Sequence, residues 1–175
     1  MKKFLLFFFF LPFTALGQNN SPDSYLGELP IRNGRINYTG IDSVSGVSKE
    51  ELYLRAKSFL STAFPNFKDV VKLDDKDLGK ITVRGIFQTD AKGGTLVKTY
   101  QEFYANTNIQ VKDGKFKYEI TDFIKPSSDL RVPDFNYEQM LFNKKRAEKL
   151  SPDINAVINR YIVALIHAMK SQDNF

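Results

Sequence analysis

Apolar and polar residues alternate along much of the middle of this chain. Four stretches with the two-residue period of half-buried strands follow one another without an intervening helix: 69–74, 79–89, 95–111 and 115–124. The third is expected to be interrupted near Ala105-Asn106. An earlier stretch, 34–44, alternates in the same way, and we expect a kink in it at Gly40. The pattern therefore predicts five strands.

The side chains of the first predicted strand are assigned to faces by the same alternation. Ile36 and Tyr38 are expected to point inward, and Ile41 and Val44 are expected to join them beyond the kink at Gly40.

The strongest local signal is the dipeptide Asp113-Gly114. Asp-Gly between alternating stretches predicts a hairpin with a type I′ turn. Counting outward from the turn pairs Lys112 with Lys115 and Val111 with Phe116, and apolar residues meet at every second pair. A one-residue slip would break this agreement, so the register is predicted, and with it a sheet that has one buried and one polar face.

Helical periodicity appears at two places. Ser48 and Glu51 fit a capping box, and the helix that they begin should end before Pro65. Ser151 and Pro152 predict the start of a second helix over 151–171. The apolar stripe of that helix needs a large surface to cover, and the buried face of the sheet is the available one: Ile154, Val157, Ile158, Tyr161, Ile162, Leu165, Ile166 and Met169.

These elements together predict one α+β domain, in which two helices lie on one face of a five-stranded antiparallel sheet in the order β-α-β-β-β-β-α. Its body is expected to span 34–124. The segment 125–150 is expected to be a connection that packs over the edge of the domain, and it leads into the last helix on the same domain.

The N-terminal residues predict export. Lys2 and Lys3 precede an apolar run, and Ala15-Leu16-Gly17 has the small residues of a signal-peptidase cleavage site. Residues 1–17 therefore have the form of a signal peptide that is cleaved after Gly17. The run is short for a membrane anchor, and no later segment is apolar enough to span a membrane. Residues 18–33 are rich in Asn, Ser, Pro and Gly, and a flexible leader is expected there. We therefore expect a periplasmic or secreted protein.

The amino-acid composition limits the kinds of catalytic and metal-binding site that the protein can form. The chain has no cysteine, one histidine and a formal net charge of +5, of which the signal peptide carries two lysines. Disulfides, thiolate metal sites and a cysteine nucleophile are excluded. Asp74, Asp75 and Asp77 do not have calcium-loop spacing and are expected in a turn. His167 lies off the apolar stripe, so no catalytic residue, metal site or cofactor is predicted.

Two sequence blocks resemble a known family. They are SKEELYLRAKSF at 48–59 and VVKLDDKDLGKI at 70–81. In this order and at this separation they resemble an uncharacterised bacterial family, domain of unknown function 4468, which is described as having a fold like one repeat of the TATA-box-binding protein. The resemblance covers about 34–124, and Phe59 stands where the family favours tryptophan. It implies the fold and no activity, ligand or catalytic residue, and the fold name alone does not imply DNA binding.

The polar face of the predicted sheet is the candidate partner-binding surface. Its residues should project together and carry a mildly basic character: Arg84, Gln88, Asn108, Gln110, Lys112, Lys115, Lys117 and Thr121. Lys112 opposite Lys115 is a like-charge pair that an anionic partner would relieve. A face kept charged only for solubility is the alternative explanation.

Function follows as a set of hypotheses. The leading one is an exported, non-enzymatic binding or scaffold module for an envelope protein or an anionic polymer, with no role in binding nucleic acid. A carboxylate-based hydrolase would need two carboxyl groups facing each other in a cleft. A small-ligand carrier would need an apolar cavity between the sheet and the helices.

Overall fold

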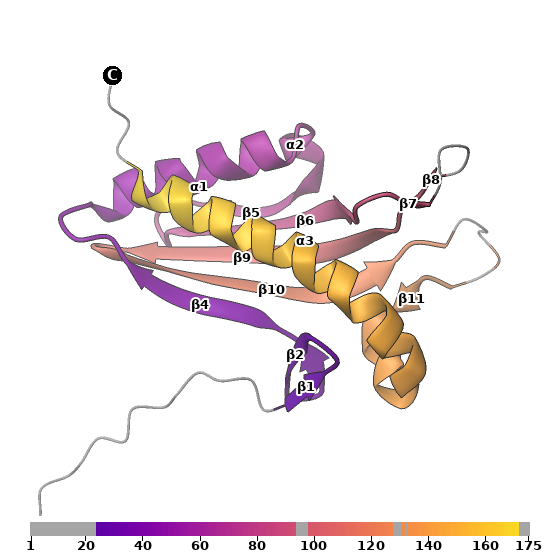
Figure 1. Cartoon of the computed structure of the whole chain (residues 1–175). Coiled ribbons are helices and arrows are strands. Elements are labelled where there is room, and N and C mark those ends of the chain that lie inside the picture. The colour runs from indigo at the N-terminus through magenta and orange to yellow at the C-terminus, as the bar shows by residue number, and fades with distance from the viewer. Residues whose placement is uncertain (1–23, 94–97, 128–130, 132, 172–175) are drawn as a thin grey trace, which may run out of the picture.

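The computed structural model describes residues 24–93, 98–127, 131 and 133–171 (Figure 1). The proposed signal peptide and residues 18–23 lie outside this part of the chain. In chain order the elements are β1 (Ser24–Leu26), β2 (Leu29–Arg32), β3 (Arg35–Ile36), β4 (Tyr38–Ser43), α1 (Lys49–Ala63), α2 (Phe67–Val70), β5 (Val71–Asp75), β6 (Lys80–Gln88), β7 (Lys92–Gly93), β8 (Lys98–Thr99), β9 (Glu102–Lys112), β10 (Lys115–Lys125), β11 (Phe135–Asn136), the 3₁₀ helix η1 (Tyr137–Phe142) and α3 (Lys144–Lys170).

The main sheet is antiparallel and has the strand order β5, β6, β9, β10, β4. The short strand β11 pairs with the far end of β10, on the same edge as β4. Each of the five stretches predicted as strands contributes to this sheet. Helices α1 and α3 lie on one side of it (Figure 1). The predicted α+β class is confirmed.

The predicted interruption near Ala105 is wrong, because β9 runs unbroken from Glu102 to Lys112. The irregularity lies in the neighbouring strand β10. The register between β10 and β9 shifts between Thr121 and Ile124, and Asp122, which lies between them, has a φ of 57°. A bulge in one strand leaves its partner continuous, so the sequence of β9 shows no break.

The hairpin between β9 and β10 has the predicted register: Lys115 lies opposite Lys112, and Phe116 lies opposite Val111. The predicted turn type is wrong. Type I′ needs a positive φ at both central residues, and Gly114 has a φ of 70°, whereas Asp113 is not among the residues with positive φ. The segment that leads into α1 contacts this turn: the Gly114 amide donates to the Val47 carbonyl at 2.9 Å, and Asp113 Oδ1 accepts from the Lys49 amide at 2.7 Å.

Strand β4 corrects the expectation of a kink at Gly40. Its pairing with β10 is regular from Tyr38 to Ser43, so there is no kink at Gly40. Ile41 consequently points away from the helices and is 60% exposed. Gly40 takes the inward position, where a Cβ would overlap the ring of Tyr118. Because glycine has no side chain, an inward glycine interrupts the alternation of apolar and polar residues in the sequence. This interruption resembles the sign of a kink, although the strand is regular.

Helix α1 begins as predicted. The Ser48 hydroxyl accepts a hydrogen bond from the Glu51 amide at 3.2 Å, and the helix ends at Ala63, before Pro65. In a full capping box the Glu51 side chain would also accept from the Ser48 amide. Here the Glu51 carboxylate pairs with Arg55 instead, at 2.9 Å. Arg55 Nη1 also donates to the Met169 carbonyl at 3.1 Å, which ties α1 to the C-terminal end of α3.

The Ser48 cap yields a local stability prediction. Ser48→Ala removes the acceptor for the Glu51 amide, so it should lower the free energy of unfolding by about 1 kcal/mol. Urea unfolding followed by circular dichroism measures this. Ser58→Ala is the matched control, because Ser58 is exposed in the middle of the same helix and should change stability little. Equal losses in both variants would contradict the capping role.

Helix α3 starts earlier than predicted. It begins at Lys144, so Lys144-Lys145-Arg146 belongs to its first turns, and Ser151 and Pro152 lie inside it. Ser151 is not an N-cap. It is 1% exposed, and its hydroxyl accepts from the Glu28 amide at 3.4 Å. The residues Ser151 and Pro152 resemble a helix start only in their local sequence. The helix continues through Pro152 because neighbouring segments of the chain pack against it.

One of those neighbouring segments is the expected flexible leader. From Ser24 onward it is not a leader, because β1, β2 and β3 form a small antiparallel sheet. Leu29 and Ile31 are buried, and Asn155 of α3 donates to the Glu28 carboxylate at 3.1 Å. Contacts with α3 thus order a segment whose local sequence predicts a loop.

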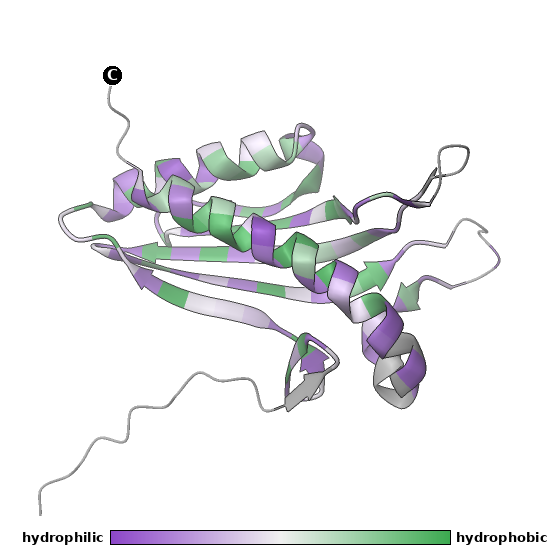
Figure 2. Ribbon diagram, in the orientation of Figure 1, coloured by the Kyte–Doolittle hydropathy of each residue, from purple (hydrophilic) through white to green (hydrophobic). Residues whose placement is uncertain are grey.

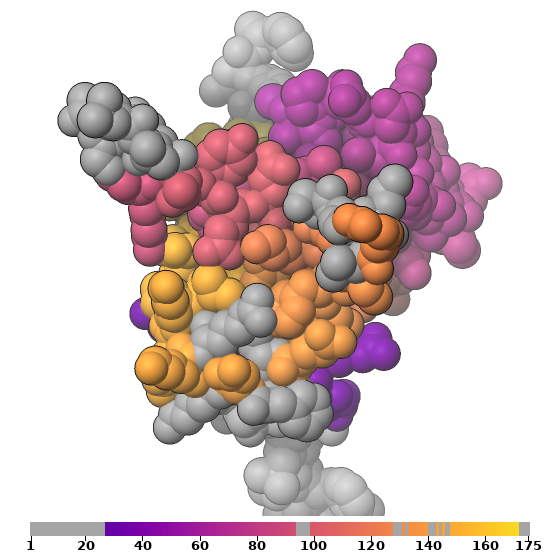
Figure 3. Space-filling view, turned by 90° about the vertical axis from the view of Figure 1, so that its right-hand side faces the viewer, coloured from indigo at the N-terminus to yellow at the C-terminus, as the bar shows by residue number. Residues whose placement is uncertain are grey.

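The connection 125–150 also contains regular structure. Phe135 and Asn136 extend the sheet as β11, and Tyr137 is 1% exposed against Phe103, with ring centroids 6.1 Å apart. Figure 3 shows this end of the molecule, where the orange surface of the connection lies beside the salmon surface of the sheet. The connection therefore closes one end of the core.

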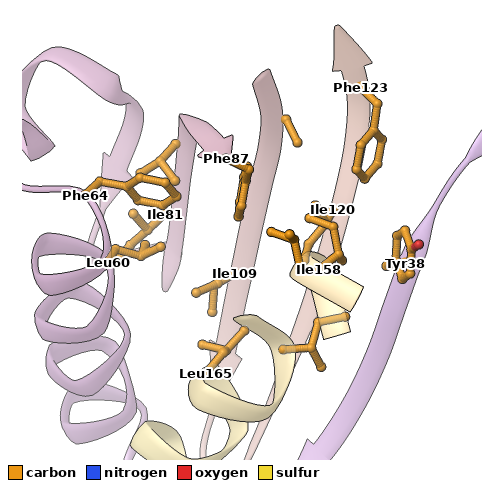
Figure 4. Close-up of a cluster of buried hydrophobic side chains, with 14 of the residues drawn as sticks. Tyr38, Leu60, Phe64, Ile81, Phe87, Ile109, Ile120, Phe123, Ile158 and Leu165 are labelled. Carbon is orange, nitrogen blue, oxygen red and sulfur yellow. The ribbon is translucent and has the colours of Figure 1, made fainter. Parts of the chain in front are cut away.

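The core lies between the sheet and the two helices. Figure 4 shows Leu60 of α1, Ile158 and Leu165 of α3, and Ile81 and Ile109 of the sheet meeting in one layer. All five are at most 1% exposed. Figure 2 shows purple and green alternating along the strands, as one buried and one polar face require. Among the described residues, no helix is long and apolar enough to cross a membrane.

Candidate binding surface on the open face of the sheet

The open face is the side of the main sheet opposite α1 and α3. Its outward residues fall into cross-strand rows that follow from the register. All eight residues predicted for the candidate surface project from this face. Two rows at one end hold four of them: Gln110, Lys112, Lys115 and Lys117.

These four residues form what we call the basic end. Together with Ile41 and Phe116 they line a surface recess of about 220 Å³. Lys112 and Lys115 lie directly opposite each other, and Lys117 lies opposite Gln110. None of the three lysines has an ion pair within the described part of the chain. Their ammonium groups are therefore not engaged by described carboxylates and can approach an anion in the recess.

The other four predicted residues take part in contacts within the face. Arg84 lies 5.5 Å from the ring centroid of Tyr104. Thr82 donates to Asn108 at 3.4 Å, and Thr121 donates to the Asp122 carboxylate at 3.3 Å. Gln88 lies opposite Glu102 at the far end. The structure thus divides the predicted surface into a basic end and a more internally paired remainder.

Glu119 marks the border of the basic end. It lies opposite Asn108 in the row after Gln110 and Lys117, and its carboxylate accepts from Asn37 at 2.9 Å. A second carboxylate, Glu102, lies farther along the face. The lysines are therefore grouped at one end, and the row that holds Glu119 separates them from Arg84, so the cations do not form a continuous track.

Sequence reasoning missed two residues at the basic end. Ile41 was expected inside and instead forms an apolar wall of the recess. Lys80 lies opposite Gln110 on β6 and adds a further cation to the same row. Lys80 could have been found by continuing the outward alternation of β6 from Arg84 through Thr82 to Lys80, whereas Ile41 required the pairing of β4.

The acidic cluster at 74–77 spans the end of β5 and the start of the turn that follows it, and its members have separate roles. Asp75 Oδ1 accepts from the Leu78 amide at 2.8 Å. Asp74 points to α1, where Lys57 donates to it at 2.6 Å and the Tyr53 hydroxyl also donates. These donors lower the pKa of the Asp74 carboxyl. Among the described residues, no group of three or more potential metal ligands of the His, Cys, Asp or Glu types comes together.

Glu138 is a carboxylate with a raised pKa near a second carboxylate, Asp122, and the two are therefore the candidates for a hydrolase pair. Burial raises the pKa of Glu138, and the neighbouring Asp122 adds to the shift. Both carboxyl groups serve structural contacts: Glu138 accepts from the Ile36 amide at 3.3 Å, and Asp122 accepts from Asn106 at 2.7 Å. Neither lines a recess described here. The Glu138 contact links η1 to β3, and the Asp122 contact links β10 to β9.

Glu138 gives a pH-dependent prediction. Because its pKa is raised on folding, its contribution to stability is complete below its ordinary pKa of 4.5 and is lost as pH rises through the folded value. Glu138→Gln should therefore raise the Tm at pH 7, on the order of 1–2 °C, and should lose that advantage near pH 4. Thermal unfolding across this range tests it. Glu102→Gln, at an exposed position, should show no such dependence, and a pH-independent effect of Glu138→Gln would contradict the prediction.

A second hollow, of about 620 Å³, lies at the surface on the outer side of α3 and is lined by Phe59, Val163 and His167 among others. His167 is exposed there. This groove faces solvent, whereas a carrier would need a cavity between the sheet and the helices.

Comparison with known proteins defines the class of fold first. The structure is similar to a TBP-like protein from Parabacteroides distasonis, with a TM-score of 0.67 and 14% identity, covering 83% of this chain and 99% of the other. It is also similar to a DUF4468 family protein from Bacteroides ovatus, with a TM-score of 0.69 and 12% identity, covering 86% and 95%. At these identities the likeness shows the fold alone, which is TBP-like.

The family follows from the sequence. Residues 38–124 match the model of the domain of unknown function (DUF4468) with TBP-like fold, and the chain belongs to this family. No curated protein matches the chain. The expected family and fold are thereby confirmed, and the family description assigns no activity.

Proposed function

We propose that this protein is an exported binding module that binds an anionic envelope partner at the basic end of its open face. The observation that carries the proposal is the grouping of Lys112, Lys115 and Lys117 around one recess, without an acidic partner among the described residues. Like charges that face each other across strands cost stability. A bound anion would remove this cost.

The architecture supports a binding role for this face. Helices α1 and α3 cover the other side of the sheet, so the open face is available along its strands (Figure 1). The recess is framed by the central strands β9 and β10 and the edge strand β4, which hold its side chains on a rigid backbone. Export is supported by the signal-peptide pattern of 1–17, and an envelope partner is the consistent choice for an exported protein.

A charge-reversal experiment tests this proposal. Lys112→Glu with Lys115→Glu should abolish capture of envelope components that the purified wild-type protein retains, and the captured set should shrink as salt is raised. Lys68→Glu with Lys72→Glu is the matched control, because both lysines are exposed and distant from the recess along the chain.

The control variant should retain the wild-type partners. If the Lys112 and Lys115 variant captured the same components as the wild type, the basic end would not be the binding site. Mass spectrometry of the mature N-terminus tests the export part separately, with Gln18 expected as the first residue.

A further inference from the structure

We infer that the recess at the basic end binds the phosphoryl group of a small phosphate monoester, whose organic part lies on Ile41. This inference rests on the proposed function, since it names the ligand of the same site.

The donors of the recess favour phosphate over carboxylate. Its polar lining consists of three lysines and the Gln110 side chain, with no arginine. Planar, bidentate recognition of a carboxylate is the strength of arginine, whereas lysine acts as a point charge and is a common phosphate ligand. A phosphate monoester carries close to two negative charges at pH 7. Such an ion can be shared among several ammonium groups.

The spacing of the lysines suits one tetrahedral ion. Directly opposed residues such as Lys112 and Lys115 have Cβ atoms about 5 Å apart. Lys115 and Lys117 lie two residues apart on β10, which is about 6.8 Å. Flexible side chains at these distances can bring their ammonium groups to one phosphate between them.

The volume limits the size of the bound group. At about 220 Å³ the recess is smaller than the roughly 300–1,000 Å³ of sites that enclose drug-sized ligands. The phosphoryl group therefore fits inside, and the rest of the ligand must lie on the surface beside it. Ile41 is 60% exposed at this position and offers an apolar contact.

The limited extent of the positive charge favours a small ligand over a polymer. A polyanion that followed the face would leave the basic end at Glu119 and would later meet Glu102. Both carboxylates would repel it. A ligand with a single terminal phosphate avoids these contacts.

Isothermal titration calorimetry with three probes tests the inference on the purified protein: inorganic phosphate, phenyl phosphate and acetate. Phenyl phosphate should bind about fivefold more tightly than inorganic phosphate, because its ring covers Ile41. Acetate should bind at least about tenfold more weakly than phosphate. Ile41→Ser should remove the advantage of phenyl phosphate and leave the affinity for inorganic phosphate within about twofold.

The lysines are tested with a charge-matched pair of variants. Lys112→Gln with Lys115→Gln and Lys117→Gln should weaken phosphate binding at least about tenfold. Lys68→Gln with Lys72→Gln and Lys145→Gln makes the same change in net charge at exposed positions outside the recess and should leave binding within about twofold. Equal losses in both triple variants, or no binding of either phosphate probe, would overturn the inference.

Two outcomes separate this inference from the proposed function. If acetate bound as tightly as phosphate through the same lysines, the ligand would be a carboxylate, and the basic end would still be a binding site. If vesicles of phosphatidylcholine and phosphatidic acid bound the protein while phenyl phosphate did not, a lipid surface would replace the small monoester. Failure of the charge-reversal capture experiment would remove the proposed function as well.

Discussion

Gly85→Ala is expected to lower the free energy of unfolding by about 3 kcal/mol, which is at the upper end for overpacking a core. Gly85 lies on β6 facing the helices, and a Cβ there would overlap the ring of Phe64. That ring cannot move aside easily. It is 7% exposed and packs against Phe87 and Tyr161, with ring centroids 5.6 and 5.9 Å away.

A double-mutant cycle isolates the cause of the Gly85 effect. In a Phe64→Leu background the smaller side chain leaves room, so adding Gly85→Ala should cost less than about 1 kcal/mol. Urea unfolding of the wild type, both single variants and the double variant supplies the four free energies. Additive losses would show that the methyl group acts elsewhere, and a wild-type midpoint for Gly85→Ala would contradict the predicted overlap.

Phe103→Ala should cost about 3–5 kcal/mol, the range for removing a buried aromatic ring. Phe103 is fully buried on β9, and its ring lies 5.6 Å from that of Phe87, 5.9 Å from Phe123 and 6.1 Å from Tyr137. It therefore joins the centre of the sheet to the connection that closes the core. A loss of this size is a large fraction of the 5–15 kcal/mol typical of a folded domain.

Glu102→Ala is the matched control for Phe103, because the two residues are adjacent on β9 and point to opposite faces. It should change the free energy of unfolding by less than about 0.5 kcal/mol. Chemical denaturation followed by tyrosine fluorescence measures both variants. A small effect of Phe103→Ala would mean that the surrounding rings repack into the space, which would contradict a rigid aromatic core.

The candidate surface could be predicted in large part because a strand has a strict two-residue period. Once Asp113-Gly114 sets the register of β9 and β10, the side of the sheet taken by Lys112, Lys115 and Lys117 is determined. The recess could not be predicted, since Ile41 reaches it only through the pairing of β4 with β10. That pairing joins segments that are far apart in the chain.

The errors at the two ends of the chain have a related cause. Ser151 and Pro152 have the composition of a helix start, and residues 18–33 have the composition of a loop. In the structure, Ser151 is instead buried against the strands that begin at Ser24, and each segment stabilises the regular structure of the other. Local propensity is a weak prior that such packing overrides.

The amino-acid sequence by itself determined the elements whose stability is local: the cap of α1 at Ser48, the hairpin register at Asp113-Gly114, and the alternation that separates a buried face from a polar one. Tertiary structure alone decided the start of α3, the order in 24–36, the inward position of Gly40 and the recess beside Ile41. The physical reason is that hydrogen bonds within a turn or between adjacent strands are encoded by neighbouring residues, whereas packing between distant segments depends on where the whole chain brings them together.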